Sequence, residues 1–402
     1  MRRLKILMLT RLFPSKAFPA FGTFCMERAK ALAEHADVRV MVPTPYYPSW
    51  LPGKEDWKKW LQVEREAVFA HGIRVTYPRY FSPPGTATWL QGVTMARSAK
   101  RELAERHDGW VPDVIDGHFA FPDGYTAMQL GHAIGVPTVV TCHGSDLRQY
   151  PKIPLVGNML RKTMGTVNRV VSVSSDLLRQ SIQLGCQPER AVLLSNGVDP
   201  AKFALRPKVE CRTRLGLPQE RKIGVYVGYL IDLKDQSLVL RALAAIRQQG
   251  MQPPLVVLVG DGPNRQRLEE EVQAMRLEKD VVFAGSCKHD EVAYWLGAAD
   301  WLLLSSRAEG WPTVYFEAMA CGRPVITSNV SAAKDAINSP EYGMIVEPRT
   351  DVAFAAAMIE ATNRDFDASI IRAYAESNSW SLWATRAMQI FEEVARERLA
   401  SG

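Results

Sequence analysis

The amino-acid sequence predicts an α/β protein with two domains, each built on a parallel sheet that helices cover on both faces. Short apolar runs rich in β-branched residues alternate with amphipathic stretches, which is the pattern of repeated strand–helix units. The pattern stops in residues 199–222, where charged residues and prolines prevail, and then starts again. The chain of 402 residues is long enough for ~2–3 domains of usual size.

The first predicted domain covers residues 1–200. A loop with prolines and a glycine follows its first strand, and the helical stretch Thr23–His35 comes next. The apolar runs do not alternate with polar residues, which indicates strands that are buried on both faces. The strand candidates are Leu4–Thr10, Val38–Val42, Val114–His118, Thr138–Thr141, Val170–Val173 and Val192–Leu194.

The second predicted domain covers residues 201–379. Its strand candidates are Ile223–Val227, Leu255–Val259, Val281–Ala284, Trp301–Leu304 and Val325–Thr327. Its helix candidates are Gln236–Gln248, Asn264–Met275, Asp290–Leu296 and Thr313–Ala320. The last stretch, Trp380–Leu399, is a long amphipathic helix with no strand after it, so we expect residues 380–402 to cross back onto the first domain.

Composition excludes several protein classes. Hydrophobic residues make up 47% and charged residues 23% of the chain, which argues against disorder, collagen and coiled coil as the main state. No apolar run reaches the ~20 residues of a membrane-spanning helix. The basic start MRRLKILMLT has too short an apolar run for a signal peptide, so we expect a cytoplasmic protein.

Cysteine usage and net charge give weaker information. No two cysteines form a CxxC pair, so we expect reduced thiols without a zinc site or a disulfide framework. The cysteines are Cys25, Cys142, Cys186, Cys211, Cys287 and Cys321. The formal charge of +6 favours anionic partners, but it does not distinguish nucleic acid, a membrane surface and phosphorylated small molecules.

Residues 43–110 interrupt the strand–helix pattern and are rich in aromatic residues. Lysines are interleaved with the rings, and this combination suits a membrane–water interface. A long loop whose aromatics pack on the domain explains the same residues, and both interpretations remain open. The basic residues form no track, so stacking on single-stranded nucleic acid is disfavoured. The residues are Tyr46, Tyr47, Trp50, Lys54, Trp57, Lys58, Lys59, Trp60, Tyr80, Phe81, Trp89 and Trp110.

The loops at the carboxyl ends of the strands hold the functional candidates, because parallel sheets bind ligands there. The loop Arg11–Gly22 lacks the GxGxxG fingerprint of a dinucleotide site, which argues against an oxidoreductase. Gly22 directly precedes Thr23 and a helix, and a glycine there lets backbone N–H groups approach an anion.

A second loop, Ser305–Pro312, leads into a helix that Gly322 ends. Glu309 precedes this helix and Glu317 lies over one turn inside it, so both carboxylates should face the N-terminal end with its free N–H groups. Such an end can bind a polyhydroxyl ligand that carries a phosphate. On spacing alone, a capping glutamate and a helix-surface glutamate would be the simpler explanation.

The segment EGWPTVYFEAMACGRPVI resembles the glutamate–seven–glutamate signature of retaining glycosyltransferases of family 4, which have the GT-B fold. HFAFPDGYTA and TCHGSD resemble acceptor-side loops of members that build bacterial cell-surface polysaccharides. LSNGVDPAKF resembles the interdomain junction, VGYLIDLKD the phosphate-contact loop, VGDGPNRQRLEE the next strand–helix unit and WSLWATRAMQIFEEV the crossing C-terminal helix. The resemblance implies a GT-B type α/β fold, in which two Rossmann-like domains have parallel sheets that face a central cleft. The N-terminal domain would bind the acceptor, and the C-terminal domain the nucleotide sugar.

The resemblance also implies roles for donor-side residues. Glu317 would hold the ribose hydroxyls of a nucleotide, and Glu309 would hydrogen-bond the donor sugar near its anomeric centre. Lys234 would neutralise the departing diphosphate, since preorganised donors stabilise developing negative charge. Backbone N–H groups around Gly22, Gly310, Trp311, Pro312 and Thr313 would contact the same diphosphate.

On the acceptor side, the resemblance places His118 opposite the reacting sugar. The acceptor-side loops contribute His143, Asp146 and Asp123. No DxD motif stands at the end of a strand candidate, so we expect no catalytic metal. No cofactor is expected either, because the nucleotide diphosphate sugar is the donor substrate.

One position departs from the family pattern. Tyr229 stands where the family often has arginine, so a bidentate phosphate donor is missing. Lys234 would then carry the positive charge alone, or Arg307 would help.

The resulting hypothesis is a retaining, metal-independent hexosyltransferase. It would move a hexose-type sugar to a hydroxyl of a lipid-linked precursor of a cell-surface polysaccharide, in peripheral contact with the inner membrane face and without nucleic acid. Retention without a carboxylate nucleophile implies a front-face reaction, in which the leaving phosphate helps to deprotonate the acceptor. Two alternatives remain open: a sugar-nucleotide epimerase or phosphorylase-like enzyme of the same fold, and a non-catalytic sugar-nucleotide-binding module.

Overall fold

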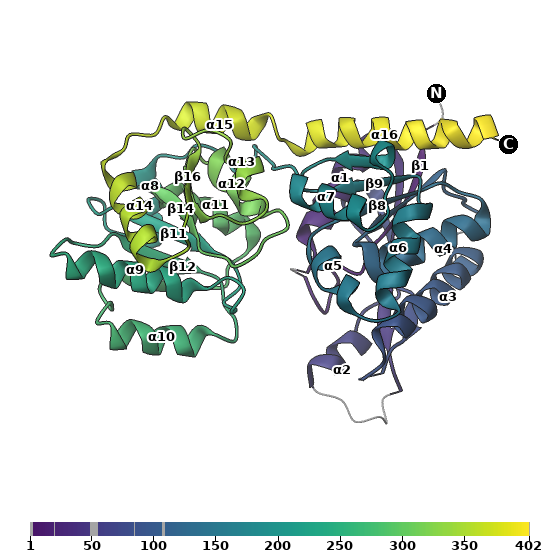
Figure 1. Cartoon of the computed structure of the whole chain (residues 1–402), viewed down its shortest axis with the longest axis horizontal. Helices are drawn as coiled ribbons and strands as arrows, with labels where there is room; N and C mark the ends of the chain where they lie inside the picture. The colour runs from purple at the N-terminus through teal and green to yellow at the C-terminus, as the bar shows by residue number, and fades with distance from the viewer. Residues whose placement is uncertain (1–2, 20, 49–54, 84, 107–108, 402) are drawn as a thin grey trace. The chain divides into compact units, whose positions relative to one another are not determined.

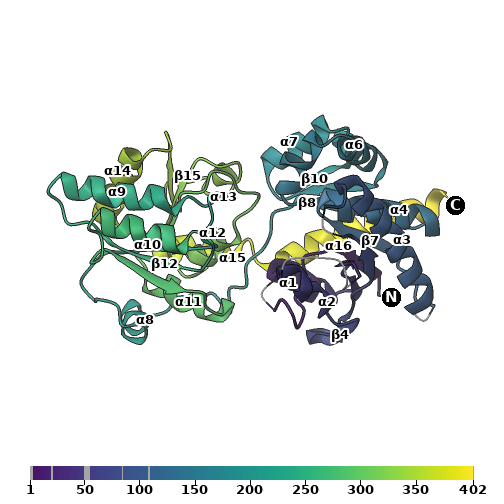
Figure 2. The ribbon, with the colours of Figure 1, turned by 90° about the horizontal axis from the view of Figure 1, so that it is seen from below.

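The computed structural model describes residues 3–401 except residues 20, 49–54, 84 and 107–108, and gives only the backbone of residues 55–57 and 399–401. The chain divides into two compact units, which are described separately (Figures 1 and 2). Unit 1 comprises residues 1–196 and 380–402, and unit 2 comprises residues 197–379. The first boundary therefore lies four residues before the expected position at residue 200.

Unit 1 is built on an eight-stranded sheet with the order β10-β9-β8-β7-β1-β2-β5-β4. The neighbouring strands are parallel except β4 and β5, which pair antiparallel at one edge. The strands are β1 (Lys5–Leu9), β2 (Asp37–Met41), β4 (Glu66–Val68), β5 (Arg74–Thr76), β7 (Val114–His118), β8 (Thr138–Cys142), β9 (Arg169–Ser172) and β10 (Ala191–Leu193). The chain order reverses between β1 and β7, so the loops after these strands flank the switch point of the sheet. A separate small sheet pairs β3 (Thr44–Tyr46) with β6 (Arg79–Phe81) in parallel.

Helices cover both faces of this sheet. Successive residues of β1 point to opposite sides and pack against different helices. Ile6 and Met8 pack in one core cluster, with residues of α1 and α16. Leu7 and Leu9 pack in another, with residues of α3 and α4. The helices are α1 (Thr23–Ala33), α2 (Glu55–Leu61), α3 (Thr88–Arg106), α4 (Tyr125–Ile134), α5 (Ser145–Arg148), α6 (Val156–Thr166), α7 (Ser175–Gln183) and α16 (Trp380–Ser401). Single turns lie at η1 (Ala70–Gly72), η2 (Ala120–Gly124), η3 (Tyr150–Lys152) and η4 (Pro188–Arg190).

The C-terminal helix α16 belongs to unit 1 and packs against α1 (Figure 1). Its apolar residues Trp383, Ala387 and Phe391 are buried in the same cluster as Ile6. The buried guanidinium of Arg28 on α1 lies 4.7 Å from the centre of the Trp383 ring.

Unit 2 has a six-stranded parallel sheet with the order β13-β12-β11-β14-β15-β16 and a switch point between β11 and β14. The strands are β11 (Ile223–Val227), β12 (Leu255–Val259), β13 (Val281–Gly285), β14 (Trp301–Leu304), β15 (Val325–Ser328) and β16 (Gly343–Val346). The helices are α8 (Lys208–Leu215), α9 (Gln236–Gln248), α10 (Arg265–Ala274), α11 (His289–Ala298), α12 (Thr313–Ala320), α13 (Ala333–Ala336), α14 (Asp351–Asn363) and α15 (Ala368–Glu376). The expected strands are present within one residue at each end, and β16, α14 and α15 extend the unit beyond them.

The aromatic residues of the segment 43–110 divide between the core and the surface. Trp60 packs on Phe18 with ring centres 4.4 Å apart, and Trp110 is 7% exposed and donates to Asp37 at 2.7 Å. Trp89 and Phe81 are 39% and 48% exposed. Packing on the domain therefore explains part of the segment, while Trp50, Lys54 and the side chain of Trp57 lie outside the described residues. In the described part of the chain, no helix is long and apolar enough to span a membrane.

Candidate functional site

The loop between β14 and α12 places a glutamate beside a lysine at the switch point of unit 2. Lys234 Nζ donates to Glu309 Oε1 at 2.5 Å, and Ser306 Oγ donates to the same oxygen at 2.5 Å. The side chains of Glu309 and Lys234 are only 10% and 21% exposed. The carboxylate therefore has a fixed orientation, with a cation beside it.

Lys234 comes from the loop between β11 and α9, and its backbone is tied to the neighbouring loop. Its carbonyl oxygen accepts from the Tyr226 hydroxyl at 2.6 Å, and Ser305 Oγ donates to the carbonyl of Asp235 at 2.7 Å. Because β11 and β14 are neighbours, both loops emerge at the same edge of the sheet. These bonds hold the loops of Lys234 and Glu309 next to each other.

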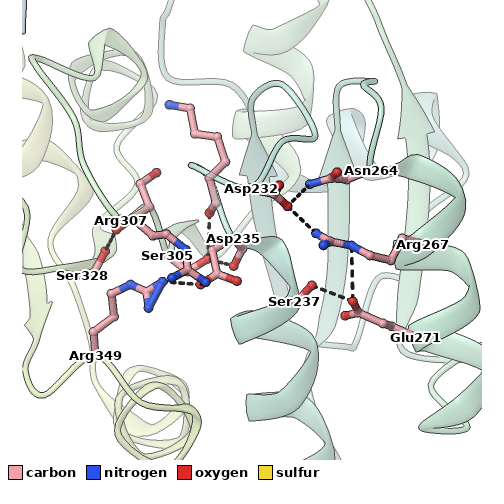
Figure 3. Close-up of polar contacts among 12 residues, drawn as sticks. Asp232, Asp235, Ser237, Asn264, Arg267, Glu271, Ser305, Arg307, Ser328 and Arg349 are labelled. Carbon is pink, nitrogen blue, oxygen red and sulfur yellow. Dashed lines mark hydrogen bonds and ion pairs between the residues drawn. The ribbon is translucent and has the colours of Figure 1, made fainter. Parts of the chain in front are cut away.

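The expectation that Arg307 helps Lys234 with a diphosphate stays a prediction. Arg307 pairs with the buried Asp235 at 2.9 Å, and Arg349 pairs with the same carboxylate (Figure 3). A buried carboxylate needs such partners. Both arginines therefore hold the N-terminus of α9, and Lys234 is the cation placed beside Glu309.

Glu317 lies in α12 and is 7% exposed. Its Oε1 is 2.9 Å from Nε2 of His289, which is the first residue of α11. Lys202 Nζ lies 2.8 Å from Nδ1 of the same ring. Three residues from distant parts of unit 2 thus form one hydrogen-bonded chain that orients Glu317.

The predicted phosphate-contact positions 310–313 form the turn that opens α12. Pro312 is the N-cap, and the Trp311 ring stacks on Phe316 with centres 5.4 Å apart. The first turn of any helix leaves its N–H groups without intrahelical partners, so Gly310, Trp311 and Thr313 bring donors to this end. Tyr229 is 60% exposed, and the expected loss of a phosphate contact at this position stays a prediction.

The two loops after β11 and β12 approach too closely for side chains. A Cβ on Gly260 would lie 2.0 Å from the carbonyl oxygen of Gly228, and Gly260 has a φ of +139°. A Cβ on Gly262 would lie 2.5 Å from the Leu230 carbonyl oxygen. These glycines let the loop that carries Lys234 pack at the sheet edge.

In unit 1, His118 belongs to an internal hydrogen-bonded chain, and its expected place opposite a reacting sugar stays a prediction. His118 is fully buried, and its Nε2 lies 2.9 Å from Asp116 Oδ2. Its Nδ1 lies 3.1 Å from Nε2 of His143, which is partly exposed. His143 is therefore the outer member of an Asp–His–His chain. Burial, followed by the charge of Arg28 and by His118, holds the pKa of His143 well below its usual range.

The two acceptor-side aspartates are fully buried and hold the loops around the switch point. Asp146 accepts from the backbone N–H groups of Ala120 at 2.9 Å and Gly144 at 2.7 Å. Asp123 accepts from the backbone N–H of Arg11 at 2.6 Å and from its Nε at 3.0 Å. Burial raises the pKa of both carboxyl groups, and these hydrogen bonds oppose the rise. Both carboxylates thus position these loops, and their predicted place on the acceptor side stays a prediction.

Gly22 is the N-cap of α1, with a φ of +69°. A Cβ there would lie 2.2 Å from the carbonyl carbon of Leu12, so only glycine fits this close approach of the loop. Its expected contact with a diphosphate stays a prediction.

The structure thus brings Lys234 together with Glu309, and Glu317 with a histidine that spacing did not assign to it. The residues that sequence patterns missed are Lys202, Asp235, Ser306 and Arg349. Within the described ranges, no group of three or more His, Cys, Asp and Glu side chains is arranged to hold a metal ion. The expectation that the reaction needs no metal stays a prediction.

The chain matches two family models in succession. Residues 22–202 match the model described as Glycosyltransferase Family 4, and residues 208–377 match the model described as Glycosyl transferases group 1. A Bacillus subtilis protein named as the teichuronic acid biosynthesis glycosyltransferase TuaC is 29% identical over 88% of both chains. The N-acetyl-alpha-D-glucosaminyl L-malate synthase of Bacillus anthracis is 27% identical over 70% of this chain and 71% of its own.

Solved glycosyltransferase structures share the fold. Anabaena HepE in complex with UDP superimposes with a TM-score of 0.74 at 19% identity, over 97% of this chain and all of HepE. Sucrose-phosphate synthase of Thermosynechococcus elongatus superimposes with a TM-score of 0.75 at 18% identity, over the full length of both chains. The ordered family matches, the glycosyltransferase relatives and the two parallel-sheet domains show that the chain belongs to the glycosyltransferases of GT-B fold and family 4 type.

Proposed function

We propose that the protein is a retaining hexosyltransferase. It takes a hexose-type sugar from a nucleotide diphosphate sugar and transfers it to a hydroxyl of a lipid-linked precursor of a cell-surface polysaccharide. The observation that carries the donor half is the Lys234–Glu309 pair beside the opening turn of α12. HepE is solved with UDP and with UDP-glucose, which supports a uridine diphosphate sugar as donor.

In the proposed reaction, the bond between the anomeric carbon and the diphosphate oxygen breaks. The departing diphosphate gains negative charge, which Lys234 Nζ and the N–H groups at the start of α12 stabilise. These groups supply positive charge from the protein, and we propose that the reaction proceeds without a metal ion for that reason. Glu317 holds the ribose, with His289 orienting its carboxylate.

The state of Glu309 supports a front-face course for retention. Its Oε1 already accepts hydrogen bonds from both Lys234 and Ser306, which lowers its value as a nucleophile. Glu309 would instead accept a hydrogen bond from a hydroxyl of the donor sugar. The leaving phosphate oxygen would take the proton of the acceptor hydroxyl. The new glycosidic bond then forms on the face that the diphosphate leaves.

The acceptor half rests on different observations. The name of the Bacillus subtilis relative refers to teichuronic acid biosynthesis, which supports a cell-surface polysaccharide as the product. The exposed rings of Trp89 and Phe81 and the exposed Lys58 and Lys59 support a peripheral contact with the inner membrane face. Liposome binding that stays unchanged when Lys58, Lys59 and Trp89 are replaced would remove this part of the proposal.

The first experiment is thermal unfolding against UDP-, GDP- and ADP-sugars without added metal. A donor at a hundred times its Kd adds about 2.7 kcal/mol to the unfolding free energy, which raises Tm by roughly 2–4 °C per kcal/mol. We expect one nucleotide to raise Tm selectively, and Glu317→Ala to abolish the rise. His132→Ala on the surface of unit 1 is the control and should leave it intact.

The second experiment measures product with the selected donor and a membrane extract as acceptor source. Nuclear magnetic resonance of the product then reports the anomeric configuration. Inversion would contradict the retaining course. A new sugar nucleotide formed from donor alone would instead identify an epimerase, and no Tm rise with any donor would contradict the donor site.

A further inference from the structure

A polar cavity of about 450 Å³ lies in unit 1 between α3 and the small β3–β6 sheet. None of its lining residues belongs to the loops after β1, β7 or β8 that flank the switch point. The charged side chains that line it are four arginines and two glutamates: Arg65, Arg79, Arg101, Arg106, Glu102 and Glu105. This composition is unlike the mostly apolar lining of ordinary small-molecule pockets and favours an anionic ligand.

Hydrogen bonds to the backbone fix the walls of this cavity. Ser98 Oγ of α3 donates to the carbonyl oxygen of Arg79 at 2.9 Å, which attaches the helix to β6. Arg79 Nη2 donates to the carbonyl oxygen of Leu61, the last residue of α2, at 2.9 Å. The α3 and β6 walls of the cavity are therefore joined to each other, and β6 is joined to α2, without a ligand.

The arginines outnumber the carboxylates that could neutralise them. Arg101 pairs with Glu105 at 2.8 Å, and Arg106 lies 3.8 Å from Glu102.

In the part of the chain that the structure describes, no carboxylate lies within 4.0 Å of the guanidinium groups of Arg65 and Arg79. Burial lowers the pKa of Arg65, the charges of Arg79 and Arg106 lower it further, and the charge of Glu102 opposes the shift. Four arginines against two glutamates leave two positive charges in the cavity without internal compensation.

We propose that this cavity binds a phosphate monoester or diphosphate group. Guanidinium groups bind phosphate oxygens through paired N–H donors, and such charge-assisted bonds are about twice as strong as neutral ones. The group can come from a free phosphorylated molecule or from a lipid headgroup at a membrane surface. Arg79 holds the end of α2, which carries the exposed Lys58 and Lys59. A lipid headgroup in the cavity would therefore lie on a membrane that these lysines can also contact. The site is independent of the donor chemistry in unit 2.

The test uses the full chain with Arg65→Gln and Arg65→Glu, and with Arg179→Glu as control. Arg179 lies on α7 of the same unit, outside the cavity, and its side chain is 67% exposed. Binding is measured to inorganic pyrophosphate by calorimetry and to vesicles by sedimentation. The vesicles contain phosphatidylcholine alone or with phosphatidylglycerol. Loss of one arginine near an anionic surface should weaken binding about fivefold, and charge reversal about thirtyfold.

The two sources give different results, and both support the site. A lipid source predicts that anionic vesicle binding falls in the Arg65 variants and not in Arg179→Glu, with weak pyrophosphate binding throughout. A free source predicts that pyrophosphate binding falls in the Arg65 variants and not in Arg179→Glu. It also predicts that the unaltered protein does not bind vesicles. Equal effects of Arg65→Glu and Arg179→Glu, or no binding of either probe, would overturn the proposal. Arg101→Gln, on the exposed side of α3, repeats the test if Arg65→Glu fails to fold.

Discussion

His289 and Glu317 form a hydrogen bond whose direction follows from the third member of the chain. His289 Nε2 lies 2.9 Å from Glu317 Oε1, and His289 Nδ1 lies 2.8 Å from Lys202 Nζ. A lysine ammonium group can only donate, so Nδ1 is the accepting nitrogen and Nε2 carries the proton that Glu317 accepts. The lysine thus fixes the tautomer that orients the Glu317 carboxylate.

We expect His289→Ala to weaken nucleotide binding about fivefold, because one hydrogen bond of about 1 kcal/mol that orients Glu317 is lost. His289→Gln, which can still donate to the carboxylate, should recover part of the affinity. The measurement is calorimetric titration with UDP or the selected nucleotide, with His132→Ala as the control. Equal Kd values for His289→Ala and the unaltered protein would show that Glu317 needs no orientation.

We expect Lys234→Ala to lower kcat by roughly 10²–10³ while changing the nucleotide Kd much less, because the lysine acts most strongly on charge that develops during bond breaking. Glu309→Gln should also lower kcat by more than about 100-fold, since the amide cannot replace a carboxylate acceptor at both oxygens. Both variants should keep the Tm rise with the donor. Full transfer by Glu309→Gln would contradict the role given to that residue.

The fold and much of the donor site could be predicted because both depend on local patterns. β-branched runs gave the strands, and the two glutamates sit on one helix and the turn before it. Their partners come from other loops, however, and pairing across loops leaves no local signal. Arg307 and Lys234 are both cations near a strand end, and only the position of Asp235 decides which one remains beside Glu309.

The acceptor side was harder because burial decides between similar residues. His118 and His143 each stand at or just after a strand, and the sequence does not show which ring is covered. One usable signal was present: Asp116 and His118 are two residues apart in a strand, so they share a face. A carboxylate beside His118 on a fully buried strand indicates an internal pair, which leaves His143 as the partly exposed partner.

We expect Arg28→Ala to destabilise unit 1 by about 2–4 kcal/mol, because the buried guanidinium makes charged hydrogen bonds and a cation–π contact. Its Nη2 and Nε donate to Asn196 Oδ1 at 2.7 and 3.0 Å, and it lies over the Trp383 ring of α16. Hydrogen exchange of α1 and α16 measures the effect within unit 1. Lys30→Ala on the same helix, a partly exposed position, should change exchange far less. Unchanged protection in Arg28→Ala would show that α16 is held by apolar packing alone.

The low pKa of His143 predicts that unit 1 loses stability as the pH falls. Burial is the main cause of the shift, and the charge of Arg28 and the adjacent His118 act in the same direction. Below the ordinary histidine value of 6.5, the unfolded chain binds a proton that the folded protein does not bind. This group should therefore lower the free energy of unfolding by up to about 1.4 kcal/mol for each pH unit below 6.5, and its contribution is fully present only above pH 6.5.

Urea unfolding at several pH values measures this slope. His143→Gln should remove the slope, and His132→Gln should keep it. Parallel pH profiles for the unaltered protein and His143→Gln would show that His143 takes up a proton equally well in the folded state.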